Sequence, residues 1–204
     1  MNAIGFNIQD NLLYGVQAGA TPRVVSFNAQ GQISGVLNIP DIGYRIVGDV
    51  DENGSLWLAD SQGGTWSQIN LSPGSVGVVA QGSFTPPYTF FDWAYVPNTG
   101  NYLWTVGRQN AENYLMRFDR SSHTIEVVGD FGGTLPENGI WGAMYADNER
   151  QMYMSNNANG QIWQIDIGNT VGPNSARLLS TGPAAGSNDG ARCAIAGSVV
   201  SVPG

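Results

Sequence analysis

The feature that most constrains the fold of this chain is an internal repeat of four short elements. The repeat occurs four times, at a spacing of about 42 to 50 residues, which is typical of propeller and array proteins. The first elements are NAIGFN (2–7), GDVDEN (48–53), DWAYVP (92–97) and GAMYAD (142–147). In the second elements a Leu or Met precedes a Tyr or Trp: LYGV (13–16), LWLA (56–59), LWTV (103–106) and MYMS (152–155).

Two further elements complete each repeat. The third elements are VVSFN (24–28), WSQIN (66–70), LMRFD (115–119) and IWQID (162–166). The fourth elements are QISGVLNI (32–39), VGVVAQG (76–82), TIEVVGDF (124–131) and ARLLSTG (176–182). All are short, rich in β-branched and aromatic residues, and bounded by Gly, Asn and Pro, which indicates strands. Four antiparallel strands per repeat at this period predict the blade of a β-propeller.

The predicted fold class is therefore all-β, a propeller of four-stranded antiparallel blades in a single domain, 1–204. The predicted blades span 2–39, 48–82, 92–131 and 142–182. A β-sandwich is the alternative architecture, but it does not explain why the same order of elements recurs. In a propeller, aromatic side chains on the second and third strands fill the layers between blades, which favours a core role for Tyr14, Trp57, Trp66, Trp104, Tyr153 and Trp163.

The last part of the chain raises the question of how such a ring closes. SNDGARCAIAG (187–197) aligns with the first elements and predicts the innermost strand of a partial fifth blade, 187–204. The residues after it are too few for three more strands, and an unpaired strand is unstable and prone to aggregate. Three alternatives remain. An N-terminal segment of a longer parent chain completes this blade, self-association completes it, or the ring closes with an incomplete blade.

Composition excludes some classes of partner. The formal net charge is −8, and all eight basic residues are arginine, so there is no lysine-rich surface for nucleic acid or an anionic membrane. No apolar run reaches the ~18 residues of a membrane span. A single cysteine, Cys193, permits no disulfide within the chain.

The order NAIGFN, LYGV, GDVDENGSLW, DWAYVP, LMRFD and NDGARC resembles an uncharacterised family of secreted fungal and bacterial propeller-like domains. The resemblance extends over nearly the whole chain. It implies a propeller fold and an extracellular setting, and it carries over no catalytic residues. The chain departs from the family pattern because it lacks a segment before NAIGFN.

One stretch is similar to a calcium-binding loop. Asp49-Val-Asp51-Glu-Asn53-Gly54 matches the start of such a loop, with Asp60 at its twelfth position. The repeat alignment instead places Asp49 on a strand and Asn53-Gly54 in a hairpin turn. We therefore favour a turn, and calcium is the one cofactor that the sequence leaves open.

The candidate binding residues are those predicted to gather around the propeller axis. Loops that lead into innermost strands converge there, so we expect a site formed by Asp49, Asp92, Trp141, Asp189 and Arg192, with Asn2 nearby. These residue types suit a polyol, a cation or a peptide. The alternative is structural: Asp and Asn cap tight turns, and Arg192 neutralises Asp189. His123 is predicted far from this axis and Cys193 inside the fold, so neither is expected to act in catalysis.

These observations predict a non-catalytic, extracellular binding module with a glycan or cell-surface protein as its partner. The polar loops 60–65, 108–114 and 155–161 join second to third strands and are expected on the same face as the Asp residues. One alternative is a metal-dependent hydrolase or lyase with Asp49, Asp92 and Asp189 around an ion in the tunnel. A second alternative is an architectural repeat of a longer adhesin or wall protein.

Overall fold

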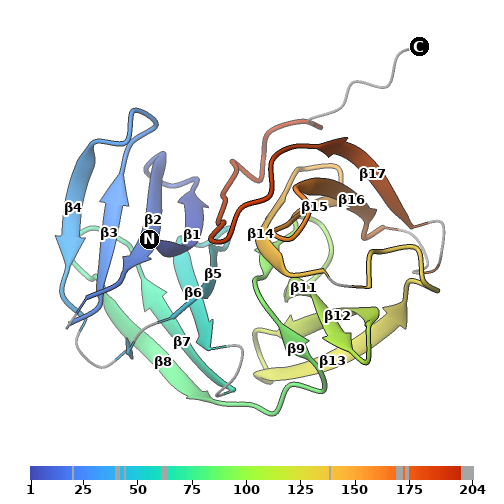
Figure 1. The fold of residues 1–204 in the computed structure, drawn as a ribbon. Coiled ribbons are helices and arrows are strands. Elements are labelled where there is room, and N and C mark those ends of the chain that lie inside the picture. The colour runs from blue at the N-terminus through green and yellow to red at the C-terminus, as the bar shows by residue number, and fades with distance from the viewer. Residues whose placement is uncertain are drawn as a thin grey trace.

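The protein is described by a computed structural model over residues 1–19, 21–39, 42–43, 45–60, 64–137, 139–168, 172 and 175–198. Four antiparallel sheets stand around a common axis like the blades of a propeller (Figure 1). Blade 1 contains β1 (Asn2–Asn7), β2 (Leu12–Gln17), β3 (Arg23–Phe27) and β4 (Ile33–Leu37). Blade 2 contains β5 (Val47–Val50), β6 (Ser55–Asp60), β7 (Thr65–Asn70) and β8 (Gly77–Ser83).

The second half of the chain repeats this order. Blade 3 contains β10 (Ala94–Tyr95), β11 (Tyr102–Gln109), β12 (Glu112–Asp119) and β13 (Thr124–Asp130). Blade 4 contains β14 (Trp141–Ala146), β15 (Gln151–Asn156), β16 (Gln161–Asp166) and β17 (Ala176–Thr181). Each blade runs in sequence order from its innermost to its outermost strand. No helix long and apolar enough to cross a membrane occurs in the described part of the chain.

The predicted all-β fold with four four-stranded blades is confirmed, and each predicted element of these four blades overlaps a strand. One strand was not predicted: β9 (Thr89–Phe90) pairs with β11 beside the two-residue β10. Between β9 and β10, Thr105 Oγ1 of β11 donates a hydrogen bond to the carbonyl of Asp92 at 2.5 Å.

A fifth innermost strand is not shown. Residues 185–198, here called the tail segment, contain no strand, and the rest of the predicted partial blade, 199–204, lies outside the described residues. The tail segment makes single backbone hydrogen bonds to blade 4, from Ala185 N to Asn157 O at 3.0 Å and from Asn148 N to Ala196 O at 3.2 Å. These bonds are too far apart to form a ladder, which is why the sequence pattern of a strand does not produce one here.

The aromatic side chains of the second strands are buried, as predicted, and those of blades 1 to 3 pack between neighbouring blades, whereas Tyr153 of blade 4 contacts the tail segment. Trp57 is 3% exposed and Tyr153 1% exposed. Each second-strand aromatic also donates a hydrogen bond to a turn residue of its own blade. The pairs are Tyr14 with Asp10 at 2.7 Å, Trp57 with Asp51 at 2.8 Å, Trp104 with Thr99 at 2.8 Å and Tyr153 with Asp147 at 2.7 Å. The repeated aromatic thus joins the protein core to the adjoining turn.

Blades 1 and 2 approach closely through a glycine. A Cβ atom at Gly5 on β1 would lie 2.4 Å from the backbone nitrogen of Val50 on β5. We expect Gly5→Ala to lower the free energy of unfolding by about 1–3 kcal/mol in urea titrations, because backbone cannot yield as a side chain can. Gly77→Ala on β8 is the control, since a Cβ there meets no atom within 4 Å. Equal stability of the two variants would contradict this close packing.

Candidate functional site

One face of the propeller contains the starts of the four innermost strands. The innermost strands begin on this face, here called the front face, at Asn2, Val47, Ala94 and Trp141. Because the strands of each blade alternate in direction, the described residues of the loops between second and third strands lie on the front face as well. The described residues of the loops that lead into each innermost strand lie there too. Two hollows open among these loops.

The structure brings Asp49, Asp92 and Asp189 together around the axis, close enough for their charges to interact. Asp49 is 8% exposed and Asp92 is 1% exposed. Asp49 accepts hydrogen bonds from Val50 N and from Tyr95 N of blade 3, both at 2.8 Å. The Asp49 carboxylate therefore joins blade 2 to blade 3 through a backbone N–H group.

Asp92 extends the same arrangement around the axis. Its Oδ2 accepts a hydrogen bond from Met144 N of blade 4 at 2.8 Å, and its Oδ1 accepts one from Gly48 N of blade 2 at 3.3 Å. Asp189, in the tail segment, accepts one from Gly190 N at 2.7 Å. The carboxylates of Asp49 and Asp92 thus bond to the backbone of neighbouring blades, whereas the structural alternative had them capping tight turns.

Burial changes the acidity of all three carboxyl groups. It raises the pKa of Asp49 to about 8, although two backbone N–H groups favour the charged form. Burial and then the nearby Asp189 raise the pKa of Asp92 well above its ordinary value. Burial likewise raises the pKa of Asp189 to about 7. The axis therefore retains protons near neutral pH that free aspartates have lost.

The other two predicted binding residues lie elsewhere. Trp141 is fully buried between blades 3 and 4, and its Nε1 donates a hydrogen bond to Asn113 Oδ1 at 3.0 Å. Arg192 donates to the carbonyl of Gly197 and lies over the ring of Tyr153, 5.9 Å from its centroid. The ion pairs found among the described residues involve Arg117 and Arg120 and do not join Arg192 to Asp189.

The stretch that is similar to a calcium loop is a hairpin turn, as favoured. Asp51 Oδ1 accepts hydrogen bonds from Asn53 N at 2.9 Å and Ser55 N at 3.0 Å, and Gly54 has a φ of 71°. Its Oδ2 accepts one from Trp57 and pairs with Arg120 at 2.7 Å. Both oxygens are therefore engaged by protein donors. Among the residues that the structure describes, no group of three His, Cys, Asp or Glu could hold a metal ion.

His123 and Cys193, which were not expected to act in catalysis, lie in different parts of the fold. The imidazole of His123 stacks on Trp66, with ring centroids 4.0 Å apart, on the seam between blades 2 and 3. Cys193 is a half-buried free thiol in the tail segment.

The first hollow of the front face, here called the axial hollow, has a volume of about 180 Å³. It combines apolar side chains with amides and a hydroxyl, and is lined by Asn2, Ile46, Phe91, Ile140, Gly142, Asn157, Gly186, Ser187 and Asn188. Phe91 and Asn188 directly precede Asp92 and Asp189 in the sequence, so the hollow lies next to the axial carboxylates. Its lining includes three residues of the tail segment.

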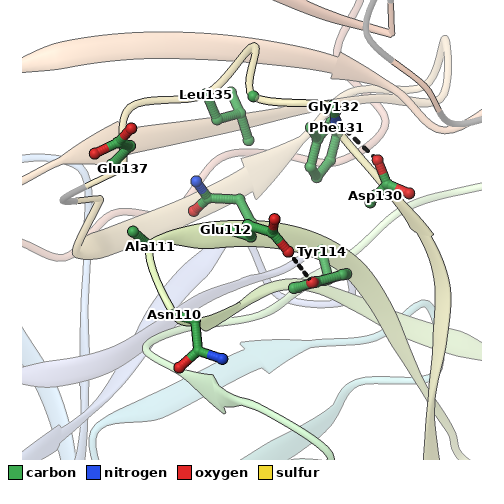
Figure 2. A pocket seen from close by; sticks show the side chains of 11 residues that line it. Asn110, Ala111, Glu112, Tyr114, Asp130, Phe131, Gly132, Leu135 and Glu137 are labelled. Carbon is green, nitrogen blue, oxygen red and sulfur yellow. Dashed lines mark hydrogen bonds between the residues drawn. The ribbon is translucent and has the colours of Figure 1, made fainter.

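The second hollow, here called the side hollow, has a volume of about 470 Å³ (Figure 2). It lies between the hairpin that joins β11 to β12 and the loop 130–137. Asn110 and Ala111 form the tip of this hairpin with positive φ angles of 50° and 69°, which a two-residue hairpin turn requires. Figure 2 shows Phe131 and Leu135 on the loop opposite Glu112 and Tyr114 of β12.

Carboxylates and an aromatic ring give the side hollow its chemistry. Glu112, Asp130 and Glu137 line it, and no lining residue is cationic. The Tyr114 hydroxyl donates to Glu112, and this bond is the main reason that the pKa of Tyr114 is raised to about 12. The Tyr114 ring packs against Tyr88, with centroids 4.3 Å apart.

Asn113 fixes the loop that forms one wall of the side hollow. Its Nδ2 donates to Pro136 O at 3.1 Å, and its Oδ1 accepts from Trp141 Nε1. The side chain is 6% exposed. Trp141 was predicted as a ligand contact, and the structure instead makes it a support for this wall through Asn113.

None of the five predicted binding residues lines this hollow. The loop 108–114 was expected on the binding face and does line the hollow, whereas loop 130–137 was not singled out. Its composition, FGGTLPE over 131–137, carried only a general signal of a loop. Contact between the two loops depends on how blade 3 meets blade 4, which no local pattern reports.

The fold is similar to that of several solved structures. The chain is similar to a chain of a nidogen/laminin complex (TM-score 0.55, 11% identity, 86% of this chain and 63% of that chain). It is similar to hydrazine synthase of Kuenenia stuttgartiensis (0.54, 11%, 86% and 48%) and to a streptogramin B lyase (0.53, 16%, 89% and 55%). At these identities the likeness shows the fold alone, and the chain spans about half the length of the solved chains it matches.

Comparison at the level of sequence is more limited. A family model described as "Repeat of unknown function (DUF6923)" matches residues 1–195. Among curated proteins, none matches this sequence.

Proposed function

Since the chain belongs to the family described as a repeat of unknown function (DUF6923), we propose a function from its own surface: it is a non-catalytic module that binds carbohydrate in the side hollow. The observation that carries this proposal is the side hollow itself, about 470 Å³ in volume and lined by Glu112, Tyr114, Asp130, Phe131 and Glu137. That volume lies within the range of ~300–1,000 Å³ that small-ligand sites occupy.

The chemistry of the hollow suits a polyhydroxylated ligand. Ionised carboxylates accept hydrogen bonds from hydroxyl groups, and the amide of Asn110 can both donate and accept. The half-buried Tyr114 ring offers apolar surface for the C–H face of a sugar ring, whereas Phe131 and Leu135 are buried in the wall of the hollow. The rigid β11–β12 hairpin and the loop held by Asn113 preform the hollow, which reduces the entropy lost on binding.

An extracellular setting is part of the same proposal. It is supported by the resemblance to secreted propeller-like domains and by a polar surface built without lysine. The partner is then a glycan of a cell surface or wall. The proposed role is recognition rather than catalysis, and the imidazole of His123 lies on another interblade seam, against Trp66.

We also propose that the tail segment takes the fifth innermost position of the ring without forming a strand. Two contacts support this placement. The Asp189 carboxylate lies among the other axial carboxylates, and a Cβ at Gly190 would lie 3.3 Å from Ala143 Cβ on β14.

A glycan array followed by calorimetric titration tests the binding proposal. We expect at least one glycan to bind and Glu112→Ala to weaken it about tenfold or more, because a hydrogen bond to a charged group contributes ~1.5–3 kcal/mol. Glu126→Ala is the matched control: Glu126 is an exposed glutamate of the neighbouring β13 that pairs with Arg117 and does not line the hollow. Absence of any glycan ligand, or an equal loss in both variants, would overturn the proposal.

A further inference from the structure

We propose that the glycans recognised in the side hollow are cationic, with free amino groups on their sugar units, rather than neutral or acidic. This inference rests on the function proposed above and specifies the class of its ligand. The charge of the lining, the spacing of its carboxylates and an aromatic ring beside two of them support it.

The described lining of the side hollow contains carboxylates without a compensating cation. Glu112, Asp130 and Glu137 are exposed in it, and no arginine or histidine is among the described lining residues. None of the three forms an ion pair in the part of the chain that the structure describes, whereas Glu126 on β13 pairs with Arg117 at 2.8 Å. A ligand that carries positive charge is therefore attracted to this hollow, and an acidic glycan is repelled.

This charge is a property of the side hollow and not of the surface as a whole. Asp and Glu make up 16 of the 204 residues of the chain, but three of the 11 residues that line the side hollow. The described lining of the axial hollow, on the same face, has amides and a hydroxyl but no charged side chain. The two hollows therefore differ in the class of ligand that they suit.

The three carboxylates are spread around the side hollow. Glu112 and Tyr114 are two residues apart on β12, so their side chains point to the same face, and Asp130 on β13 lies directly opposite Tyr114. Glu137 comes from the opposite loop, and Figure 2 shows the three carboxylates at separate places. In agreement, no group of three acidic, His or Cys side chains among the described residues could hold a metal ion. Separated carboxylates suit positive charges that are spaced along a ligand, as amino groups are on successive sugar units.

The Tyr114 ring, next to Glu112 and Asp130, provides a further contact for the same ligand. The ring is half-buried, and its hydroxyl donates a hydrogen bond to Glu112, which holds that carboxylate beside the ring. The face of an aromatic ring attracts an ammonium group. It also packs against the C–H groups of a sugar. A protonated amino sugar offers both groups to the ring, whereas a neutral sugar offers only the second.

Three trisaccharides with the same linkage separate charge from shape. The trimers of glucosamine, N-acetylglucosamine and glucose differ at one carbon of each unit, which carries an ammonium, an acetamide or a hydroxyl group. We would measure the binding of each by calorimetric titration at pH 6, where the amino groups are protonated. We expect the glucosamine trimer to bind about tenfold or more tightly than either neutral trimer, because charge-assisted hydrogen bonds are about twice as strong as neutral ones.

The dependence on salt provides a second readout of charge. Raising the salt concentration from about 20 mM to about 300 mM shortens the distance over which exposed charges interact. We expect this change to weaken the glucosamine trimer several-fold and to leave the affinities of the neutral trimers almost unchanged.

Glu112→Gln is the matched variant, because it removes a charge, keeps the size and leaves an acceptor for the Tyr114 hydroxyl. We expect it to weaken binding of the glucosamine trimer by about threefold to tenfold, and to change binding of the neutral trimers by less than about twofold. Glu126→Gln, outside the hollow, should leave all three affinities unchanged. Glu137→Gln, on the opposite loop, provides the same test where Glu112→Gln does not fold.

Two results would overturn the inference: a glucosamine trimer that binds no more tightly than the neutral trimers, or trilysine, a probe of charge alone, that binds as tightly as the glucosamine trimer. The proposed function is judged separately. A neutral glycan whose binding Glu112→Ala still weakens would retain carbohydrate recognition and remove the preference for amino sugars. If no glycan binds at all, both proposals are wrong.

Discussion

Replacement of Asp51 by alanine is expected to lower the free energy of unfolding by about 3–5 kcal/mol, among the largest effects of any single substitution in this chain. Asp51 is 3% exposed and lies in the first hairpin turn of blade 2. Its carboxylate accepts hydrogen bonds from two backbone N–H groups, Asn53 and Ser55, and from Trp57 Nε1. Alanine removes the acceptor of all three donors, and the donors of Ser55 and Trp57 belong to buried residues.

The same carboxylate also joins blade 2 to blade 3. Arg120, at the end of β12, is 7% exposed, and its Nη1 contacts Asp51 Oδ2 at 2.7 Å and Glu52 Oε2 at 2.8 Å. Removing Asp51 leaves the guanidinium with Glu52, whose side chain is 39% exposed and partly screened by water. A buried cation that loses its buried partner is a costly state, which explains the expected magnitude.

Urea unfolding monitored by tryptophan fluorescence measures this effect. Asp119→Ala is the matched control, because Asp119 also accepts two backbone hydrogen bonds in a turn, from Ser121 and Ser122, but at an exposed site without an arginine. We expect that control to lose about 1 kcal/mol. A similar loss in both variants would show that the contact between Asp51 and Arg120 contributes little.

Recurrence in the sequence was sufficient to predict the blades. The four-element repeat is visible in the sequence because each blade packs with the same residue types at the same positions. One example is the second-strand aromatic, which is Trp57 in blade 2 and Tyr153 in blade 4. Strand ends followed closely from Gly and Asn at turns. The exception, 187–197, has the composition of an innermost strand, but a strand forms only where a neighbouring strand completes its hydrogen bonds.

The candidate site was predictable only in part. Convergence of loops on the axis correctly brought Asp49, Asp92 and Asp189 together, because their place in the repeat fixes their place in the ring. Whether they face a ligand or the backbone of the next blade depends on side-chain direction, which the repeat does not encode. Arg120 shows the same limit: it lies 69 positions from Asp51 in the sequence, and no local pattern pairs the two.

Stability is expected to fall as pH rises from 5 to 8, opposite to the usual behaviour of proteins rich in carboxylates. Burial raises the pKa of Asp49 to about 8, from an ordinary value of 3.8 in the unfolded chain. Between these values the folded protein holds a proton that the unfolded chain has released. This contribution is complete below pH 3.8 and is lost progressively up to about pH 8, at about 1.4 kcal/mol per pH unit for each such proton.

Asp92 and Asp189 act in the same direction, because burial raises both pKa values and the three groups interact. The axis therefore titrates as a unit rather than as three independent sites. Urea titrations at pH 5, 6, 7 and 8 in constant salt should show the decline. Asp49→Asn should reduce the slope, because asparagine keeps an acceptor for Tyr95 N without a titrating proton, whereas the exposed Glu126→Gln should not. A stability that rises from pH 5 to pH 8 would mean that the axial carboxylates are charged in the folded ring, and that their backbone hydrogen bonds outweigh burial.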